Sequence, residues 1–215
     1  MDVQSIMRLL LATVSLMGVN TVFAASPHHQ AAPVQQAAGP HQSHKAMMTH
    51  KARYEKRQAT YTLPTTPLID ASGKQHKLST LLASESPILL NFIFTSCTTI
   101  CPILSATFSQ AQADLMANTP SPRMISISID PEYDTPTRLT DYAKKFNVGP
   151  NWSFYTGNMD DIVALQRAFD IFRGNKMNHI PVVFMRSAKD QPWNRFDGFM
   201  SKANLLMEYQ YLVDQ

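Results

Sequence analysis

The only two cysteines of the chain, Cys97 and Cys101, directly follow an apolar run at residues 88–94. The run has no polar alternation and is preceded by a proline, which is typical of a strand buried on both faces. After Pro102 the apolar residues recur at helical spacing, which predicts a helix over residues 102–117. The cysteines are therefore predicted to lie between a central strand and the helix that follows it.

Pro102 indicates where the two thiols lie relative to the start of the helix. A proline disfavours helical backbone at the residue before it and is well tolerated at the first helical position. We therefore expect Cys97 and Cys101 in the loop before the helix. This is the positive end of the helix, where thiolates are favoured over thiols.

Two thiols with three residues between them allow more than one chemistry. The pair can close to a disulfide, and it can also chelate a soft metal ion. Two thiolates are too few for a closed structural zinc site, so a metal site needs a further ligand from elsewhere. Alternatively, both cysteines are buried and inert. Their position next to each other at a strand–helix junction favours a chemical role.

Length and charge limit the classes of function. A chain of 215 residues with 44% hydrophobic residues is long enough for one ordinary domain plus additional segments. The net charge of +3 is too small to indicate nucleic-acid binding, and its excess lies in one segment rather than on a folded face.

The first 24 residues resemble an export signal. Residues 6–24 form an apolar stretch broken only by Arg8 and a few small polar residues, and Val22-Phe23-Ala24 has small residues where a signal peptidase cleaves. Cleavage after Ala24 is expected, and an uncleaved membrane anchor is the alternative because the run approaches the length of a membrane span. Either way the domain is expected to leave the cytoplasm, most simply for the periplasm. An oxidising compartment would close the cysteines unless a metal or a reductant intervenes.

Residues 25–58 are predicted to form a disordered linker. They are rich in Ala, Gln, Pro and His and show no hydrophobic periodicity. Five of the seven histidines fall here, namely His28, His29, His41, His44 and His50, together with Met47 and Met48. Such a tract can collect copper ions weakly. A solvated spacer is the slightly favoured interpretation.

Residues 59–215 are predicted to form the folded domain. A hairpin is expected at residues 68–78, with Ser72-Gly73 at its turn. The other expected strands are 88–94, 124–129, 152–155, 180–185 and an edge strand at 196–199, and the expected helices are 102–117, one from Pro136, 160–172, and one after a Ser201 cap. Strands that alternate with helices indicate an α/β domain. A dithiol after the first core strand and a proline that begins a later one indicate a thioredoxin-like fold: a central mixed sheet flanked by helices, with an N-terminal hairpin extension.

Three stretches resemble one family. Residues 94–102, F-T-S-C-T-T-I-C-P, resemble the C-x-x-x-C-P signature of the SCO/SenC copper chaperones. Residues 127–136, I-S-I-D-P-E-Y-D-T-P, are similar to the family's second signature, S-x-D-P-x-x-D-T-P. His179 stands before a predicted strand, where these proteins keep a histidine. The resemblance covers roughly residues 60–212.

The resemblance implies a thioredoxin-like domain that binds one copper ion, as Cu(I) or Cu(II), through Cys97, Cys101 and His179. It also implies a partner, a copper-receiving subunit of a respiratory oxidase or a similar cuproprotein, and we expect a monomer. Two stretches depart from the family pattern. Thr98-Thr99 stand where members often have Pro-Asp, and Asn178 replaces the usual Asp before the histidine, which removes an acceptor able to orient the site.

Two functions of different classes remain open. In the first, a metallochaperone passes copper to its partner by ligand exchange; Cu(I) is soft and accepts two thiolates and an imidazole. In the second, a thiol-disulfide oxidoreductase uses Cys97 and Cys101 as its redox pair to reduce the cysteines of the copper-receiving protein. A peroxidatic thiol enzyme ranks last, because no arginine accompanies Cys97 in the sequence.

Further residues near these motifs have alternative roles. His179 could simply be a hydrogen-bonded loop histidine. Asp130 and Asp134 could bind metal, but their proline-flanked setting favours helix capping and loop stiffening. Met177 is close enough in sequence to His179 to be a weak additional ligand.

Overall fold

The computed structural model describes residues 54–118 and 120–215, all of which belong to one compact unit. The predicted signal or anchor at residues 1–24 and the predicted linker up to residue 53 lie outside the described residues. Within the part of the chain that the structure describes, none of the helices has the length and apolar character needed to cross a membrane.

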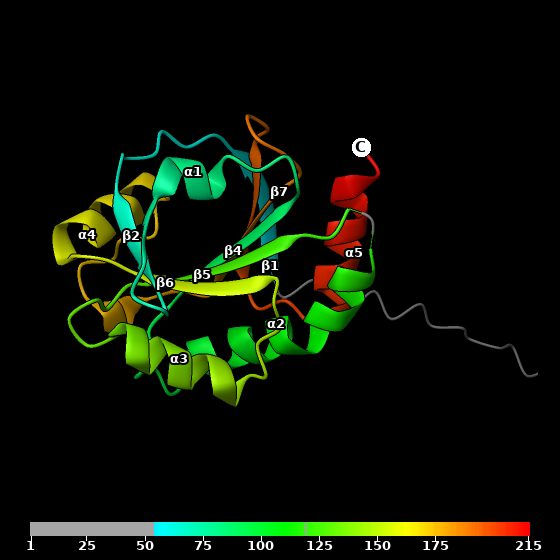
Figure 1. The fold of residues 1–215 in the computed structure, drawn as a ribbon. Helices are drawn as coiled ribbons and strands as arrows, with labels where there is room; N and C mark the ends of the chain where they lie inside the picture. The colour runs from blue at the N-terminus through cyan, green and yellow to red at the C-terminus, as the bar shows by residue number, and fades with distance from the viewer. Residues whose placement is uncertain (1–53, 119) are drawn as a thin grey trace, which may run out of the picture. The chain divides into compact units, whose positions relative to one another are not determined.

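One mixed sheet of eight strands forms the centre of the domain (Figure 1). Its strand order is β1-β8-β7-β4-β5-β6-β2-β3. The strands are β1 (Tyr54–Ala59), β2 (Pro67–Asp70), β3 (Gln75–Lys77), β4 (Ile88–Ile93), β5 (Arg123–Ser128), β6 (Trp152–Thr156), β7 (Val182–Arg186) and β8 (Trp193–Gly198). The neighbours β4, β5 and β6 run parallel, and the other pairs are antiparallel.

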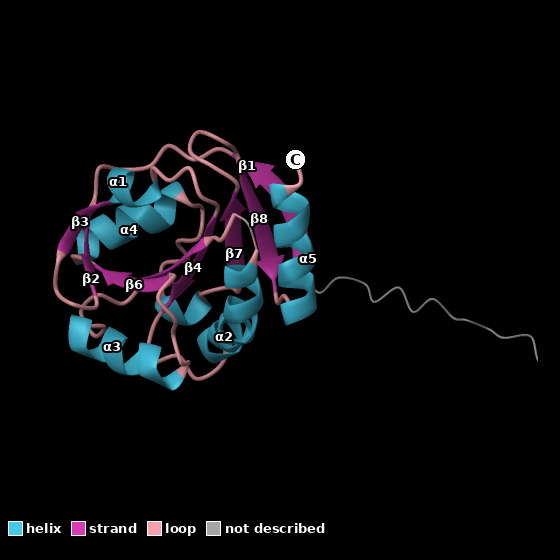
Figure 2. Cartoon of the chain, turned by 45° about the vertical axis from the view of Figure 1, so that its right-hand side comes forward, coloured by secondary structure: helices cyan, strands magenta, loops and turns pink. Residues whose placement is uncertain are grey.

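Helices cover the sheet on both faces. They are α1 (Leu78–Leu82), α2 (Ile100–Ala117), α3 (Pro136–Lys145), α4 (Met159–Ala168) and α5 (Lys202–Val213), and a short 3-10 turn, η1 (Lys176–Asn178), lies before β7. Helices α1 and α4 lie together on one face, and α2 and α3 lie on the other (Figures 1 and 2). Helix α5 packs against α2 and β7.

The apolar runs of the sequence form the centre of this sheet. All six residues of β4 are buried, as expected for a central strand covered by helices on both faces. The predicted hairpin is confirmed: β2 pairs with β3 in antiparallel register, and Gly73 in its turn has a φ of +88°, which favours glycine. Ser201 caps α5 as predicted, because its side chain accepts a hydrogen bond from the Asn204 N–H.

The predicted end of the linker at residue 58 is wrong. Residues 54–59 form β1, which pairs with β8 from Tyr54–Gly198 to Ala59–Trp193. Four of the six β1 side chains are exposed, so the strand is held mainly by backbone hydrogen bonds and by side-chain contacts at its start. There the Tyr54 hydroxyl donates to Glu208 at 2.8 Å. Because most of its side chains are exposed, β1 has no alternation of apolar and polar residues in the sequence. The pattern that predicts strands is therefore missing, and residues 54–58 were assigned to the linker.

The same strand corrects the prediction for β8. We expected an edge strand at residues 196–199, but β8 begins at Trp193 and has β7 on one side and β1 on the other. An uncovered β8 would expose a row of backbone N–H and C=O groups, which can template pairing with another chain. Strand β1 removes that exposure.

Removing β1 is therefore expected to destabilise the domain. A chain that begins at residue 60 should unfold at a lower urea concentration than one that begins at residue 54. The expected loss of unfolding free energy is roughly 2 kcal/mol or more, because several backbone hydrogen bonds worth about 1 kcal/mol each disappear. The chain that begins at residue 54 is the matched control. Equal urea midpoints for the two chains would show that β1 contributes nothing to folding.

The start of α2 also differs from the prediction. The helix begins at Ile100, so Pro102 is its third residue and Cys101 lies inside the first turn. A proline is tolerated there because the first four N–H groups of a helix have no partner within the helix. The prediction that both thiols lie in the loop is thus correct for Cys97 and wrong for Cys101.

Candidate functional site

The turn between β4 and α2 brings the two cysteines together. The Cys97 N–H donates to the Phe94 carbonyl at 3.1 Å, which closes the turn after the strand. The Cys101 N–H donates to the Cys97 Sγ at 3.4 Å, and the Phe94 N–H donates to the Cys101 Sγ at 3.4 Å. Both residues are free thiols, with Cys97 8% exposed and Cys101 fully buried.

The pKa values of the two thiols are shifted in opposite directions. Burial alone would raise the pKa of Cys97, but hydrogen bonds from the backbone N–H groups of Cys101 and Thr99 outweigh it and lower the pKa of this thiol. For Cys101 burial dominates and raises the pKa, and the charges of Cys97 and Asp134 act in the same direction. Cys97 is therefore the thiol that more readily becomes a thiolate, and Cys101 stays protonated until a cation or a bond to sulfur replaces its proton.

A buried carboxylate holds the start of the cysteine turn. Asp134 is fully buried, and its oxygens accept hydrogen bonds from the Thr95 N–H at 3.0 Å and from the hydroxyls of Thr95 and Ser128. Asp134 thus ties residue 95, two positions before Cys97, to the end of β5. Sequence analysis expected Asp134 to cap a helix and stiffen its own loop, and it did not predict this contact with the cysteine turn.

The expected capping role of the two aspartates is wrong. Thr135 caps α3, because its hydroxyl accepts from the Arg138 N–H. Asp134 braces the cysteine turn, as described above. Asp130 is 6% exposed and forms an ion pair with Lys176 of η1. A Thr-Pro pair already supplies the cap and the first helical residue, which leaves both carboxylates free for other contacts.

His179 follows η1 and is almost completely buried. Its side chain is 5% exposed, and its ring lies edge to face with the Phe94 ring at 6.3 Å between centroids. Burial lowers the pKa of His179 to about 4, and a backbone hydrogen bond with Phe92 acts in the opposite direction. Phe92 lies just beyond the last β4–β7 residue pair, Asn91–Val183, so the imidazole contacts the backbone where the ladder has ended.

One ring nitrogen of His179 has no hydrogen-bond partner. Its Nε2 is buried and unpaired among the described residues. In a neutral imidazole one ring nitrogen carries a hydrogen and the other carries a lone pair. An unpaired buried polar atom costs about 1–3 kcal/mol, so its retention favours a role as a ligand.

The three predicted ligands are not assembled in one group. Among residues 54–118 and 120–215, no three His, Cys, Asp or Glu side chains are close enough together to hold a metal ion. The structure thus brings Cys97 and Cys101 together in one turn and does not group His179 with them. Two thiols and an imidazole are nevertheless a donor set that suits soft copper.

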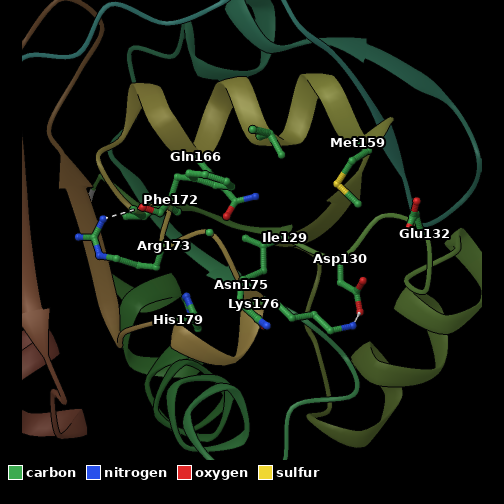
Figure 3. A pocket seen from close by; sticks show the side chains of 13 residues that line it. Ile129, Asp130, Glu132, Met159, Gln166, Phe172, Arg173, Asn175, Lys176 and His179 are labelled. Atoms are coloured by element: carbon green, nitrogen blue, oxygen red, sulfur yellow. Dashed lines mark hydrogen bonds and ion pairs between the residues drawn. The ribbon is translucent and has the colours of Figure 1, made fainter.

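A cavity of about 370 Å³ adjoins His179 (Figure 3). Helix α4 lines one side with Met159, Val163 and Gln166, and the segment 171–179 that leads to His179 lines the other. Asp130 and Lys176 lie at its rim, joined by their ion pair. The segment that carries His179 therefore has open space on one side.

Comparison with known proteins identifies the family. The SCO1/SenC family model matches residues 41–214, which include the cysteine turn, the second motif and His179. The chain belongs to the SCO1/SenC family. A Bacillus subtilis SCO1 homologue is 43% identical over 70 residues, a segment that spans 32% of this chain and 36% of that protein.

Solved Sco structures confirm the predicted thioredoxin-like fold of this family member. Arabidopsis thaliana ScoI with copper bound aligns with a TM-score of 0.60 and 22% identity, covering 70% of this chain and 96% of that one. BsSco, described as a member of the Sco family of cytochrome c oxidase assembly proteins with a disulfide switch, aligns with a TM-score of 0.61 and 24% identity over 74% of this chain and 96% of that one.

His179 makes the stability of this SCO1/SenC domain depend on pH. Its pKa falls from 6.5 in the unfolded chain to about 4 in the folded one, so between these values the unfolded chain binds more protons. Stability is therefore highest above pH 6.5 and decreases as the pH falls toward 4. We expect a loss of about 2 kcal/mol between pH 7 and pH 5 from this group alone.

The measurement is urea unfolding of the reduced, metal-free protein at both pH values, compared with His179→Asn. The variant lacks the titrating ring and should lose less stability over this interval, although other groups titrate in both proteins. Identical losses in the two proteins would mean that His179 titrates normally in the folded state.

Proposed function

We propose that this protein is an extracytoplasmic copper chaperone that delivers copper to the copper centre of a respiratory oxidase or a similar cuproprotein. Cys97, Cys101 and His179 would bind one ion. The observation that carries the proposal is the buried Nε2 of His179, which has no hydrogen-bond partner among the described residues. A histidine with a purely structural role would be expected to have a partner for this buried atom.

The thiols and the relatives support the same role. Two thiolates with one imidazole form a suitable three-coordinate site for Cu(I), and Cys101 would release its proton when the cation binds. The Arabidopsis relative has copper bound, and the BsSco relative belongs to a family of cytochrome c oxidase assembly proteins.

A thiol-disulfide reductase is the second candidate. The lowered pKa of Cys97 and the raised pKa of Cys101 are the division of roles that a dithiol exchange needs. Cys97 would attack one sulfur of a partner disulfide and form a mixed disulfide. Cys101 would then lose its proton, attack Cys97 and release the partner as a dithiol, so that two electrons pass to the partner.

The deciding experiment compares the reduced and the disulfide forms of the same wild-type protein. The reduced form should bind one Cu(I) ion tightly in competition with a chromogenic chelator, and the oxidised form should lose that ion. Residues 25–58 contain no cysteine, so any copper held there is equal in both forms. Equal tight binding by the two forms would overturn the cysteine site.

The proposed function includes a location for the protein and a role for each part of the chain. Residues 6–24 support export across the inner membrane to the periplasm, by a cleaved signal or with a retained anchor. The corrected folded domain, from residue 54, would then act as a monomer. An oxidising compartment would make the copper-bound or newly reduced dithiol the functional form.

A further inference from the structure

The cavity next to His179 has no role in the function proposed above. Its volume of about 370 Å³ lies in the lower part of the range of roughly 300–1,000 Å³ that is typical of ligand sites. One wall is α4, and the other is the segment from residue 171 to His179 (Figure 3). The space is therefore large enough for a small ligand.

The wall opposite α4 is held in place at its start. The Arg195 guanidinium, 1% exposed, donates through Nη1 to the Phe169 carbonyl at 2.7 Å and the Asp170 carbonyl at 3.2 Å. The Gln166 carbonyl accepts a hydrogen bond from the Ile171 N–H at 2.9 Å, which joins the end of α4 to this segment. The two walls are thus bonded to each other and the cavity between them is preformed.

A polar side chain of α4 points into this cavity. Gln166 is 7% exposed, and Figure 3 shows its amide projecting from α4 into the cavity without a hydrogen bond to the other lining residues. Buried polar side chains nearly always have a hydrogen-bond partner. The amide presents a carbonyl acceptor and an NH2 donor, and a peptide residue offers the complementary N–H and C=O. Gln166 is therefore suited to bind the backbone of a peptide.

Apolar side chains line the cavity together with this amide. They come from α4, from the residue after β5 and from the opposite segment, namely Met159, Val163, Ile129, Ile171 and Phe172. Apolar walls with a small number of polar groups are typical of ligand sites, in which the polar groups fix the orientation of the ligand. This lining favours a ligand that has an apolar side chain beside a hydrogen-bonding group.

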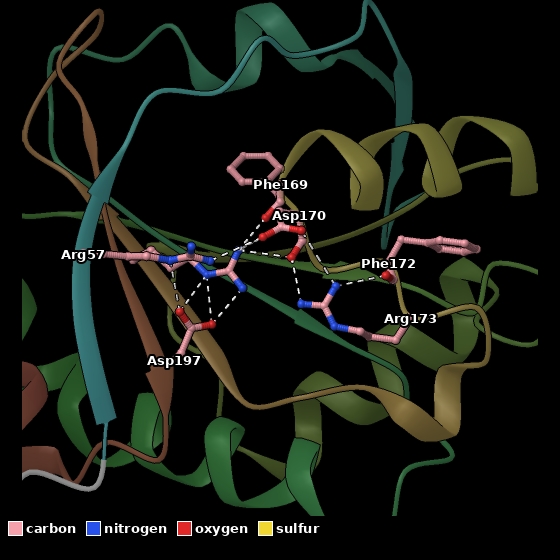
Figure 4. Close-up of polar contacts among 7 residues, drawn as sticks. Arg57, Phe169, Asp170, Phe172, Arg173 and Asp197 are labelled. Atoms are coloured by element: carbon pink, nitrogen blue, oxygen red, sulfur yellow. Dashed lines mark hydrogen bonds and ion pairs between the residues drawn. The ribbon is translucent and has the colours of Figure 1, made fainter.

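The charged residues around the cavity do not favour a charged ligand. Asp130 and Lys176 form an ion pair with each other. The Arg173 guanidinium donates to the Asp170 carbonyl at 3.1 Å (Figure 4), and Glu132 is exposed to solvent. An anion would meet cations that already have partners, and a cation would meet a carboxylate that is solvated or already paired. A neutral ligand fits this surface best.

On the basis of the function proposed above, we propose that this cavity is a docking site for a short, uncharged peptide segment of the copper-receiving partner. An apolar side chain of that segment enters the cavity, and its backbone hydrogen-bonds to Gln166. His179 lines the cavity, and its ring contacts the ring of Phe94, whose N–H donates to the Cys101 Sγ. The docked segment therefore lies against the turn that carries a proposed copper ligand.

The probe for this site is the blocked tripeptide N-acetyl-Gly-Leu-Gly-amide, which has no charge and one apolar side chain. It is titrated into the reduced full chain while the backbone amide signals are followed by NMR. We expect saturable shifts confined to α4 and residues 171–179. N-acetyl-Gly-Gly-Gly-amide keeps the backbone and lacks the side chain, and it should bind at least about tenfold more weakly because no apolar side chain is buried.

Variants of α4 locate the binding. Val163→Trp fills the cavity and should weaken binding of the leucine tripeptide at least about tenfold, since the space for its side chain is lost. Ala164→Trp places the same residue at the next, exposed position of the helix and should bind like wild type. Gln166→Leu removes the amide at similar size and should weaken binding roughly threefold to tenfold. This variant also tests the site if Val163→Trp folds poorly.

The outcomes separate the docking site from the proposed function. The docking site is overturned if no saturable shifts appear at α4, or if both cavity variants bind the leucine tripeptide like wild type. In a strain that lacks the protein, Ala164→Trp should complement and the cavity variants should complement less. Full complementation by cavity variants that have lost the tripeptide would overturn the partner segment as the occupant. Failure of the reduced wild-type protein to bind Cu(I) would instead overturn the proposed function and leave the tripeptide result unchanged.

Discussion

Replacing Cys97 or Cys101 by serine is expected to abolish tight Cu(I) binding. One thiolate with one imidazole is a poor site for a soft ion, and a serine hydroxyl is a hard ligand that stays protonated at neutral pH. We expect affinity to fall by at least about three orders of magnitude in chelator competition, because half of the thiolate ligands are lost. The control is Thr98→Ala, an exposed residue between the two cysteines, which should bind copper like wild type.

The two serine variants should nevertheless differ in thiol chemistry. Cys101→Ser keeps the more acidic thiol, so with a disulfide-bonded partner it should accumulate a mixed disulfide through Cys97. Cys97→Ser keeps only the buried thiol with the raised pKa and should form little. Non-reducing gels resolve the two products. Stoichiometric tight copper binding by the double serine variant would place the metal site outside this turn, for example in the histidine-rich residues 25–53.

The sequence was sufficient to predict the elements whose side chains are buried. Strand β4 is an unbroken apolar run because both of its faces are covered, and the helices show their buried stripe at helical spacing. Strand β1 shows the limit of that method. Its mostly polar side chains face solvent, and the backbone groups that hold it to β8 are the same in every residue type.

The candidate site was predictable only where a motif places residues close together in sequence. The motif at residues 97–101 positions both thiols through one turn, and the structure bears this out. The bracing of Thr95 by Asp134 joins residues 39 positions apart, and the Lys176–Asp130 pair joins residues 46 positions apart. No local pattern encodes such contacts, because they depend on how β5 and the 171–179 segment pack around the cysteine turn.

The position of His179 changes what its motif implies. The resemblance implied that His179 binds copper together with the two cysteines, and in the structure its ring lies edge to face with the Phe94 ring. Asn178 stands where the family usually has an aspartate next to the histidine. Its side-chain Nδ2 donates a hydrogen bond to the Arg173 carbonyl at 3.4 Å. Among the described residues no carboxylate is hydrogen-bonded to the buried Nε2 of His179, so this ring nitrogen lacks an acidic partner that would orient it.

His179→Ala is expected to decide between the two functions. The imidazole supplies one of three ligands, so copper affinity should fall by roughly one to three orders of magnitude. Thiol-disulfide exchange depends on the thiolate fraction of Cys97 and on the leaving sulfur, so reduction of a partner disulfide should be nearly unchanged. The paired assays are chelator competition for Cu(I) and a gel shift for partner reduction.

His76→Ala is the matched control, because His76 is the other histidine of the folded domain and bonds to Asp70 on the β2–β3 hairpin. It should change neither assay. Wild-type copper affinity in His179→Ala would show that His179 is not a ligand. If His179→Ala loses affinity and also fails to complement a strain that lacks the protein, copper delivery is the physiological role. Full complementation despite lost affinity would favour the reductase, since only the dithiol would then be needed.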